Sequence, residues 1–258
     1  MNSLKISEHI IKWLKEYCDN SKMAGFIIGI SGGVDSALTS TLCALTGKKV
    51  ILLSMPIRQT KSEFERANNH IKDLKLKFEN VESIEIDLSL SFSEIEKTFP
   101  KEVLNNKLAM ANSRSRLRML TLYAVGQSNN CLVTGTGNKI EDFGVGFYTK
   151  YGDGGVDISP IADLTKTQVW TLSKYLNIIP EIVSAKPTDG LFEDGRSDED
   201  QMGATYPELE WAMEFKGDIT KLEERQKTVL TIFKRLNSIN QHKMNPIPVC
   251  NIPISFLD

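Results

Sequence analysis

Hydrophobic side chains along the chain follow two patterns, short apolar runs and apolar positions at helical spacing. Strand-like patterns occupy four segments: residues 26–30, 49–55, 83–88 and 131–135. Helical spacing and helix-start signals predict helices over residues 3–20, 37–45, 61–78, 101–127, 166–176, 206–215 and 220–237. Because the strands alternate with helices, the sequence predicts an α/β fold, a doubly wound parallel sheet flanked by helices with a helical C-terminal part.

Several segments follow neither pattern. Residues 143–157 are rich in glycine, which predicts a shaped loop, and residues 186–198 form a long polar loop of the kind that often acts as a lid. Residues 242–248 are expected to be extended, and residues 89–98 to form a short helix or a loop. Since no repeat, low-complexity tract or linker interrupts the chain, we expect a single domain over residues 1–258.

Composition narrows the class of protein. Charged residues make up 25% of the chain, hydrophobic residues 41%, and the net charge is −2, which is typical of a soluble globular protein and argues against unspecific binding of nucleic acid. No apolar stretch approaches the roughly 20 residues of a membrane span, and no signal peptide is visible. The four cysteines are scattered, so we expect reduced thiols and a cytoplasmic protein.

The first candidate site is the sequence Ser-Gly-Gly-Val-Asp-Ser at residues 31–36, between a strand and a helix. Glycines let the backbone approach a ligand, and the first amides of a helix attract anions, so this turn predicts a phosphate site. It lacks the lysine of the G-x-x-x-x-G-K-[ST] loop and carries Asp35 instead. A carboxylate beside phosphate calls for a bridging divalent cation, for which Mg²⁺ is suited. The alternative is a simple turn in which Asp35 or Ser36 caps the helix.

A second turn follows the strand at 131–135 and contains Glu141. The carboxyl ends of parallel strands share one edge of the sheet, so both turns should face the same crevice, with Glu141 as the second metal ligand. The alternative for Glu141 is an acid at a helix N-terminus. Lys166 lies at a predicted helix start, where a cation is unfavourable, which suggests that it serves an anion. His9 and His70 lie on predicted helices and are expected to be solvated.

Residues 112–119 place three arginines at spacings of two: Arg114, Arg116 and Arg118. On a helix, Arg114 and Arg118 share a face that Arg116 does not. They are either solvated surface charges, or at least one of them contacts a phosphate or a carboxylate.

Taken in order, the motifs resemble one family. They are Ser-Gly-Gly-Val-Asp-Ser, Arg-x-Arg-Met, Gly-Thr-x-Asn-x-x-Glu, Thr-Lys-Tyr-Gly-Asp-Gly-Gly-x-Asp, Leu-Thr-Lys, Lys-Pro-Thr and His-Lys. The first motif resembles the pyrophosphate loop of N-type ATP pyrophosphatases, which have a Rossmann-like, adenine nucleotide alpha hydrolase-like fold, and alone it would also fit GMP synthetase, asparagine synthetase or tRNA-modifying relatives. The whole set, and residues 150–157 most specifically, resembles ammonia-dependent NAD synthetase. One departure is that the stretch between Glu141 and Lys150 is a residue longer than the family pattern.

The resemblance implies a role for each matching residue. ATP would be bound by the loop and three later residues: Gly29, Ile30, Ser31, Gly32, Gly33, Val34, Asp35, Ser36, Thr136, Lys166 and Thr188. Deamido-NAD⁺ would be bound by Arg116, Lys150, Asp157, His242 and Lys243. Asp35 and Glu141 would bind Mg²⁺. The catalytic candidates are Asp35, Lys166 and Asp157, and Asp157 or Asp153 could bind or deprotonate ammonium.

The resemblance also implies the reaction. The nicotinate carboxylate attacks the α-phosphorus of ATP, releasing pyrophosphate and forming an adenylate, which ammonia converts to NAD⁺ and AMP. The family acts as a homodimer with the dinucleotide site near the subunit interface. The roughly 30 residues before the first strand are too few for the nitrilase-like glutaminase domain of glutamine-dependent relatives, so free ammonia or a separate partner is expected to supply nitrogen.

Two other readings remain open. One is an ATP pyrophosphatase that acts on tRNA or on another nucleotide, although the acidic balance argues against tRNA. The other is a nucleotide-binding regulatory protein without chemistry. The joint presence of Asp35, Glu141 and Lys166 argues against it, because a sensor needs no such set.

Overall fold

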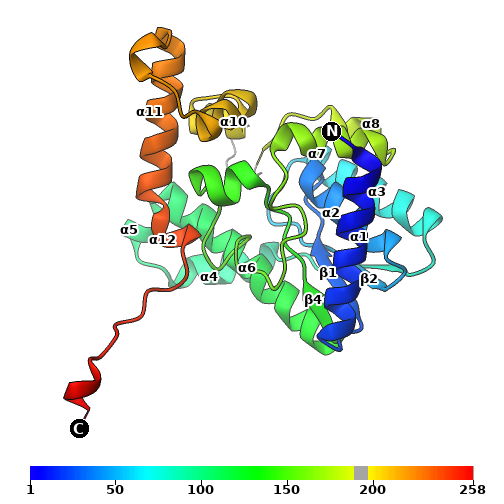
Figure 1. The fold of residues 1–258 in the computed structure, drawn as a ribbon. Helices are drawn as coiled ribbons and strands as arrows, with labels where there is room; N and C mark the ends of the chain where they lie inside the picture. Colours follow the sequence, from blue (N-terminus) through cyan, green and yellow to red (C-terminus); the bar gives the residue numbers. More distant parts are fainter. Residues whose placement is uncertain (189–196, 258) are drawn as a thin grey trace.

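The computed structural model describes residues 1–188 and 197–257, and its centre is a parallel sheet of four strands in the order β3-β2-β1-β4 (Figure 1). The strands are β1 (Gly25–Gly29), β2 (Lys49–Ser54), β3 (Val81–Glu85) and β4 (Cys131–Val133). In the register of the sheet, Gly25 lies beside Lys49 on one side and Cys131 on the other. The carboxyl ends of β1 and β4 therefore meet at the same edge, as the sequence predicted.

Helices cover both faces of this sheet. The apolar side chains of β1 alternate between the faces, because successive residues of a strand point to opposite sides. Phe26 and Ile28 pack with α1 (Ser3–Asn20), α2 (Val34–Leu45), α3 (Lys61–Lys77) and α7 (Lys166–Tyr175). Ile27 packs on the other face with α4 (Ser89–Thr98) and α6 (Lys107–Ser128). The doubly wound α/β fold is confirmed, and none of the described helices is long and apolar enough to cross a membrane.

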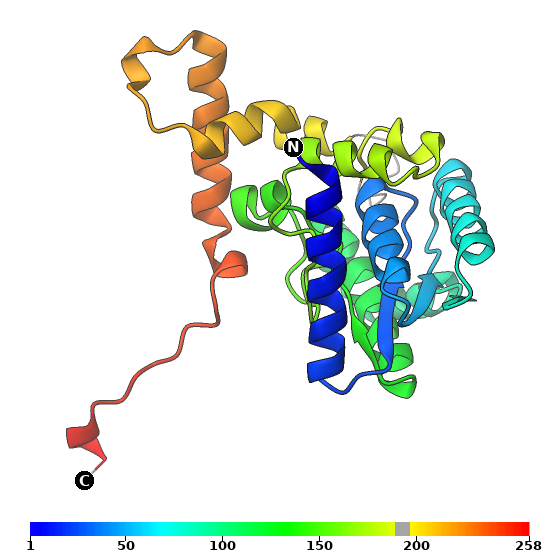
Figure 2. The same ribbon diagram turned by 45° about the vertical axis from the view of Figure 1, so that its right-hand side comes forward.

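A helical C-terminal part with its own apolar cluster lies beside the sheet domain. It comprises α9 (Asp198–Met202), α10 (Tyr206–Glu214), a 3₁₀ turn (Ile219–Lys221), α11 (Glu224–Ile239) and α12 (Gln241–Met244), whereas α8 (Pro180–Val183) packs in the core of the sheet domain through Ile182. Tyr206, Leu209 and Leu230 pack in the cluster with Ile140 from the turn after β4. Figures 1 and 2 show α11 standing away from the sheet, with an extended chain leaving α12.

Several predicted boundaries were wrong. The third strand begins at Val81, two residues earlier than expected, because its register is fixed by pairing with β2 and not by its own alternation. The helix expected over 101–127 is broken into α5 (Lys101–Leu104) and α6, with Asn106 capping α6. Residues 241–244 form α12, so only the chain after them is extended.

The prediction for His70 was also wrong. Its side chain is 1% exposed and hydrogen-bonds Ser40 of α2 at 2.9 Å, since α3 packs this face against the core. Burial lowers the pKa of His70 to about 4, so it is a neutral core histidine at pH 7.

Candidate active site

The turn after β1 has the strand–turn–helix geometry that the sequence predicted. Gly32 has φ +85°, and a Cβ there would lie 2.6 Å from the carbonyl oxygen of Glu63, so only glycine fits. The Ser36 hydroxyl donates to the Gly33 carbonyl at 3.0 Å and lies 3.2 Å from the Ser31 hydroxyl. The serines thus hold the turn from within, and its residues line a cavity.

The cavity has a volume of about 650 Å³ and lies where the two strand ends meet. Residues 29–36 form one wall and residues 134–137 another, so the predicted shared crevice is present. Predicted ATP contacts that line it include Thr136, Lys166 and Thr188. Thr188 donates to a Glu63 carboxylate oxygen at 2.9 Å. Most of the predicted lid, residues 189–196, lies outside the described residues.

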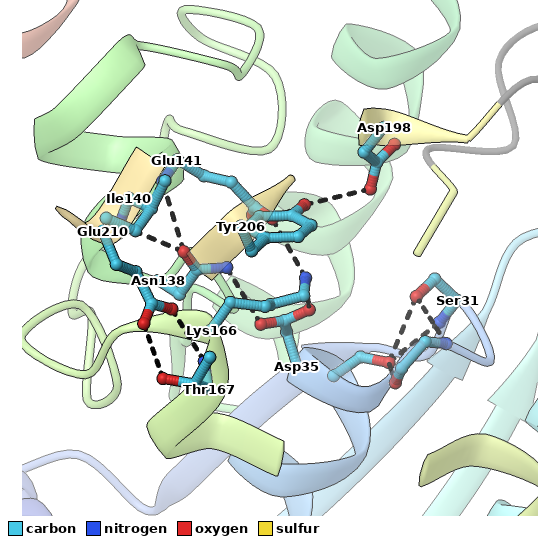
Figure 3. Close-up of polar contacts among 12 residues, drawn as sticks. Ser31, Asp35, Asn138, Ile140, Glu141, Lys166, Thr167, Asp198, Tyr206 and Glu210 are labelled. Atoms are coloured by element: carbon cyan, nitrogen blue, oxygen red, sulfur yellow. Dashed lines mark hydrogen bonds and ion pairs between the residues drawn. The ribbon is translucent and has the colours of Figure 1, made fainter. Parts of the chain in front are cut away.

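A buried lysine joins the two predicted metal ligands (Figure 3). Lys166 Nζ lies 2.6 Å from Asp35 Oδ2 and 3.0 Å from Glu141 Oε1, and the lysine side chain is only 2% exposed. Burial lowers the pKa of Lys166, but the adjacent carboxylates of Asp35 and Glu141 outweigh it and hold this pKa above its usual range. Lys166 is therefore a charged ammonium paired with two carboxylates of the protein itself, whereas its predicted role toward a bound anion stays a prediction.

Asn138 ties the two turns together, and sequence reasoning missed it. Its Nδ2 donates to Asp35 Oδ1 at 3.1 Å, and its Oδ1 accepts from the amides of Ile140 and Glu141 at 3.1 and 3.2 Å. The side chain is fully buried. A signal existed in the sequence, because Asn138 is the fixed asparagine of Gly-Thr-x-Asn-x-x-Glu.

Two residues of α10 also reach this centre. The Tyr206 hydroxyl donates to Glu141 Oε1 at 2.5 Å, and the Glu210 carboxylate accepts from the amide and hydroxyl of Thr167 at 2.9 and 2.6 Å. Neither was identified from the sequence, because nothing in the pattern of α10 distinguishes an inward tyrosine from a core aromatic.

The turn after β4 continues as a π-helix over Ile140–Val145, within the segment expected to be irregular. A π-turn accommodates one additional residue in a helix. The helix ends at Gly146 with φ +64°.

Two further carboxylates line the cavity beside this π-helix. Burial and then the charges of Glu141, Asp153 and Asp35 raise the pKa of Asp142 to about 8. Asp153 accepts hydrogen bonds from the Ser115 hydroxyl at 2.6 Å and the Thr149 amide at 3.1 Å, but burial outweighs these bonds and raises the pKa of Asp153 as well. Both carboxyl groups therefore hold a proton more readily than an exposed aspartate does.

The residues predicted to bind the dinucleotide do not all lie in the cavity. Arg116 donates to the Lys150 carbonyl at 3.2 Å, Lys150 donates to the His242 carbonyl, and Lys243 donates to the Tyr148 carbonyl at 2.9 Å. Of these, only Lys243 lines the cavity that the described residues form.

Asp157 stands apart from that group. It accepts from the Tyr123 hydroxyl at 2.9 Å and the Val133 amide at 2.8 Å, and it does not line the described cavity. Of the two candidates for handling ammonium, Asp153 is the one that faces the cavity.

Among the three arginines of α6, Arg118 is the one that lines the cavity. Its Nε donates to the Met55 carbonyl at 3.1 Å, while its Nη2 is buried without a hydrogen bond from the described residues. The solvated interpretation therefore does not hold for Arg118.

Comparisons with known proteins show the family to which the chain belongs. The family model described as NAD synthase matches residues 6–247. An NH(3)-dependent NAD(+) synthetase of Mycoplasma genitalium is 39% identical over 246 residues, which cover 95% of this chain and 94% of that protein. One of Archaeoglobus fulgidus is 35% identical over 259 residues, which cover 98% of each chain.

Two solved structures are similar over nearly all of the chain. An NMN synthetase from Francisella tularensis has a TM-score of 0.86 at 30% identity, covering 98% of this chain and all of that one. An NH3-dependent NAD synthetase from Campylobacter jejuni has a TM-score of 0.79 at 26% identity, covering 97% and 100%.

Proposed function

The chain belongs to the NAD synthase family, and from this premise we propose that it uses ATP and ammonia to amidate deamido-NAD⁺, the last step of NAD⁺ biosynthesis. The products are NAD⁺, AMP and pyrophosphate. The observation that carries the proposal is the Lys166 ammonium held between Asp35 and Glu141, at the mouth of the glycine turn. Such a charged centre beside a phosphate-binding turn suits the departure of pyrophosphate.

The chemistry explains why no side-chain nucleophile is needed. A carboxylate is a poor electrophile, so the nicotinate group first displaces pyrophosphate from the α-phosphorus of ATP. Ammonia then attacks the resulting adenylate and expels AMP. The amides of the glycine turn and the ammonium of Lys166 stabilise the negative charge that develops on the leaving pyrophosphate. We infer that Asp153, which lines the cavity, accepts a proton from ammonium.

The residues present fit a divalent cation. Asp35 and Glu141 already share one cation, the ammonium of Lys166, so their carboxylates are arranged for positive charge. Within the described residues, no group of three or more histidine, cysteine or acidic side chains could hold a metal, so phosphate oxygens and water would complete the coordination. Mg²⁺ bound there would offset the charge of the triphosphate.

The dinucleotide end of the substrate would contact Arg116, Lys150, Asp157, His242 and Lys243. Because most of these side chains lie outside the cavity, we extend the proposal to a homodimer in which a second copy closes this region. Support comes from exposed apolar side chains on the same helix as Arg116: Leu120 is 66% exposed and Tyr123, which bonds Asp157, is 37% exposed. Light scattering on the eluting protein should give twice the 28.9 kDa of one chain. A monomer would contradict this part.

A second candidate differs in the substrate. The similarity to an NMN synthetase favours amidation of nicotinate mononucleotide by the same chemistry. The curated relatives at 35–39% identity favour the dinucleotide.

One experiment separates these outcomes. The protein is incubated with ATP, Mg²⁺ and an ammonium salt, together with either deamido-NAD⁺ or nicotinate mononucleotide. We expect NAD⁺ and AMP from the first mixture, with the higher kcat/KM. Formation of ADP would contradict the mechanism, a preference for the mononucleotide would support the second candidate, and no product from either would exclude both.

A further inference from the structure

Tyr206 connects the C-terminal helices to the charged centre. It is the first residue of α10, and its side chain is fully buried. Its hydroxyl lies 2.5 Å from Glu141 Oε1 and 3.3 Å from Asp198 Oδ2 (Figure 3). Its ring faces Lys166, with 4.6 Å between Nζ and the ring centroid. One side chain thus contacts both the lysine and one of the two carboxylates that the proposed reaction uses.

The hydrogen bonding orients Glu141. A tyrosine hydroxyl has a single proton, and the contact to Glu141 at 2.5 Å is the stronger of the two bonds, since that to Asp198 is 3.3 Å long. Glu141 Oε1 therefore accepts from both Tyr206 and Lys166. No hydrogen bond from the described part of the chain reaches Glu141 Oε2. The carboxylate is anchored through one oxygen, and the other remains available to a ligand.

The tyrosine is itself held rigidly. Its amide donates to a Glu199 carboxylate oxygen at 2.9 Å, and Thr205 and Glu208 form a capping box around the start of α10. The Trp170 ring packs edge-on against its ring, with 6.0 Å between centroids.

A second residue of α10 stabilises the start of α7, next to Lys166. One helical turn after Tyr206, Glu210 accepts two hydrogen bonds from Thr167, the residue that follows Lys166. The start of α10 therefore fixes the start of α7, and both ends of the Lys166–Glu141 contact depend on it.

We propose that Tyr206 is a positioning residue for the amidation: its hydroxyl fixes Glu141 through Oε1, so that Oε2 would be left to ligate a divalent cation, while its ring contacts the Lys166 ammonium. This inference rests on the proposed function. Without the hydroxyl, Glu141 can rotate and offer both oxygens to Lys166, so a cation has to compete for it. The hydroxyl should therefore govern the apparent affinity for Mg²⁺ more than the rate at saturation.

The test is Tyr206→Phe, which removes the hydroxyl but keeps the ring and its packing. A hydrogen bond to a charged group typically contributes about 1.5 kcal/mol or more, which corresponds to about tenfold in an equilibrium constant. We expect the Mg²⁺ concentration for half-maximal rate to rise about tenfold, with kcat at saturating Mg²⁺ changed by less than about threefold. Calorimetric titration of Mg²⁺ in the presence of pyrophosphate should show the same loss without turnover.

Tyr175→Phe is the matched control. Tyr175 lies at the opposite end of α7 from Lys166, is 46% exposed, and undergoes the same chemical change. Its Mg²⁺ dependence should equal that of the wild type. ATP binding in EDTA should also be equal in all three proteins, which shows that the site is intact.

The outcomes are distinct. If the wild type forms NAD⁺ and Tyr206→Phe retains its Mg²⁺ dependence and Mg²⁺ affinity, the positioning role is wrong although the proposed function stands. If the wild type forms no NAD⁺, the proposed function itself fails. Should Tyr206→Phe not fold, NMR of the wild type labelled on tyrosine decides. The Tyr206 hydroxyl proton should be downfield and shift when Mg²⁺ and pyrophosphate are added, and an absent response overturns the inference.

Discussion

Removing the ammonium of Lys166 tests how much its ion pairs with Asp35 and Glu141 contribute to the stability of the protein. Lys166→Met keeps the length of the side chain but leaves Asp35 and Glu141 facing each other without a cation. From the distances of 2.6 and 3.0 Å, the attraction is about 6 kcal/mol for each pair at an effective dielectric constant of about 20. Desolvation of the ammonium and repulsion between the carboxylates offset much of this sum. Breaking a buried pair by removing one partner typically costs about 3–5 kcal/mol, which we expect here.

The assay is urea unfolding at pH 7 in EDTA, followed by circular dichroism. Lys139→Met is the matched control, because Lys139 pairs with Asp163 at a similar distance, 2.9 Å, but the Asp163 side chain is 96% exposed. An exposed pair contributes about 1 kcal/mol or less, so this control should unfold nearly as the wild type does. Both substitutions lose the same chemical group, so the difference isolates burial.

Unfolding measured with added Mg²⁺ is the second part of this test. In Lys166→Met the two carboxylates lack their cation, so millimolar Mg²⁺ should recover part of the lost stability even without ATP. In the wild type Lys166 occupies that position, and the gain should be smaller. A loss below about 1 kcal/mol, or equal stabilisation of both proteins by Mg²⁺, would refute the reasoning.

Three other perturbations probe the site and the core. Asp35→Asn should lower kcat/KM for NAD⁺ formation by about a hundredfold or more, while the free energy of unfolding falls by less than in Lys166→Met, because Glu141 still pairs with Lys166. A loss of stability comparable to the loss of turnover would favour a mere helix cap. Asp142 binds a proton in the folded state up to its pKa of about 8 but only below about 4 when unfolded, so its contribution to stability falls as pH rises from 4 to 8, by up to about 1.4 kcal/mol per unit. Urea unfolding of Asp142→Asn should lack this decline, and curves for the two proteins that run parallel with pH would contradict it. His70 is neutral when folded down to its pKa of about 4 but becomes protonated below about 6.5 when unfolded, so stability is lost as pH falls through that window. His70→Asn should flatten the acid limb measured by thermal unfolding, and an unchanged slope would show that another group is responsible.

The sequence by itself determined the fold class and the edge of the sheet at which the site lies. Short apolar runs predict strands, and their alternation with helical patterns predicts a parallel sheet. Both features can be recognised from residues close together in the chain. The turn at residues 31–36 needs φ > 0 at Gly32, and the glycine at this position in the sequence indicates that requirement. Parallel topology then brings the ends of β1 and β4 to one edge, so Asp35 and Glu141 could be assigned to one crevice before any distance was known.

The partners of those residues required the tertiary structure. Tyr206 follows Glu141 by 65 positions, and only the packing of α10 against the π-helix brings its hydroxyl to the carboxylate. The burial of His70 could not be read from α3 alone, because it depends on which face α2 covers. The same limit applies to Asp157, whose motif is clear but whose side chain bonds β4 and α6 outside the cavity.

The interpretation of Lys166 shows where the two kinds of information meet. Its sequence position, at a helix start that disfavours a cation, indicated that an anion must be near. The structure decided that, in the free protein, the anions are the two carboxylates themselves. Local chemistry is encoded within a few residues, whereas the pairing of charges 131 and 25 positions apart is decided by how the helices pack around the sheet.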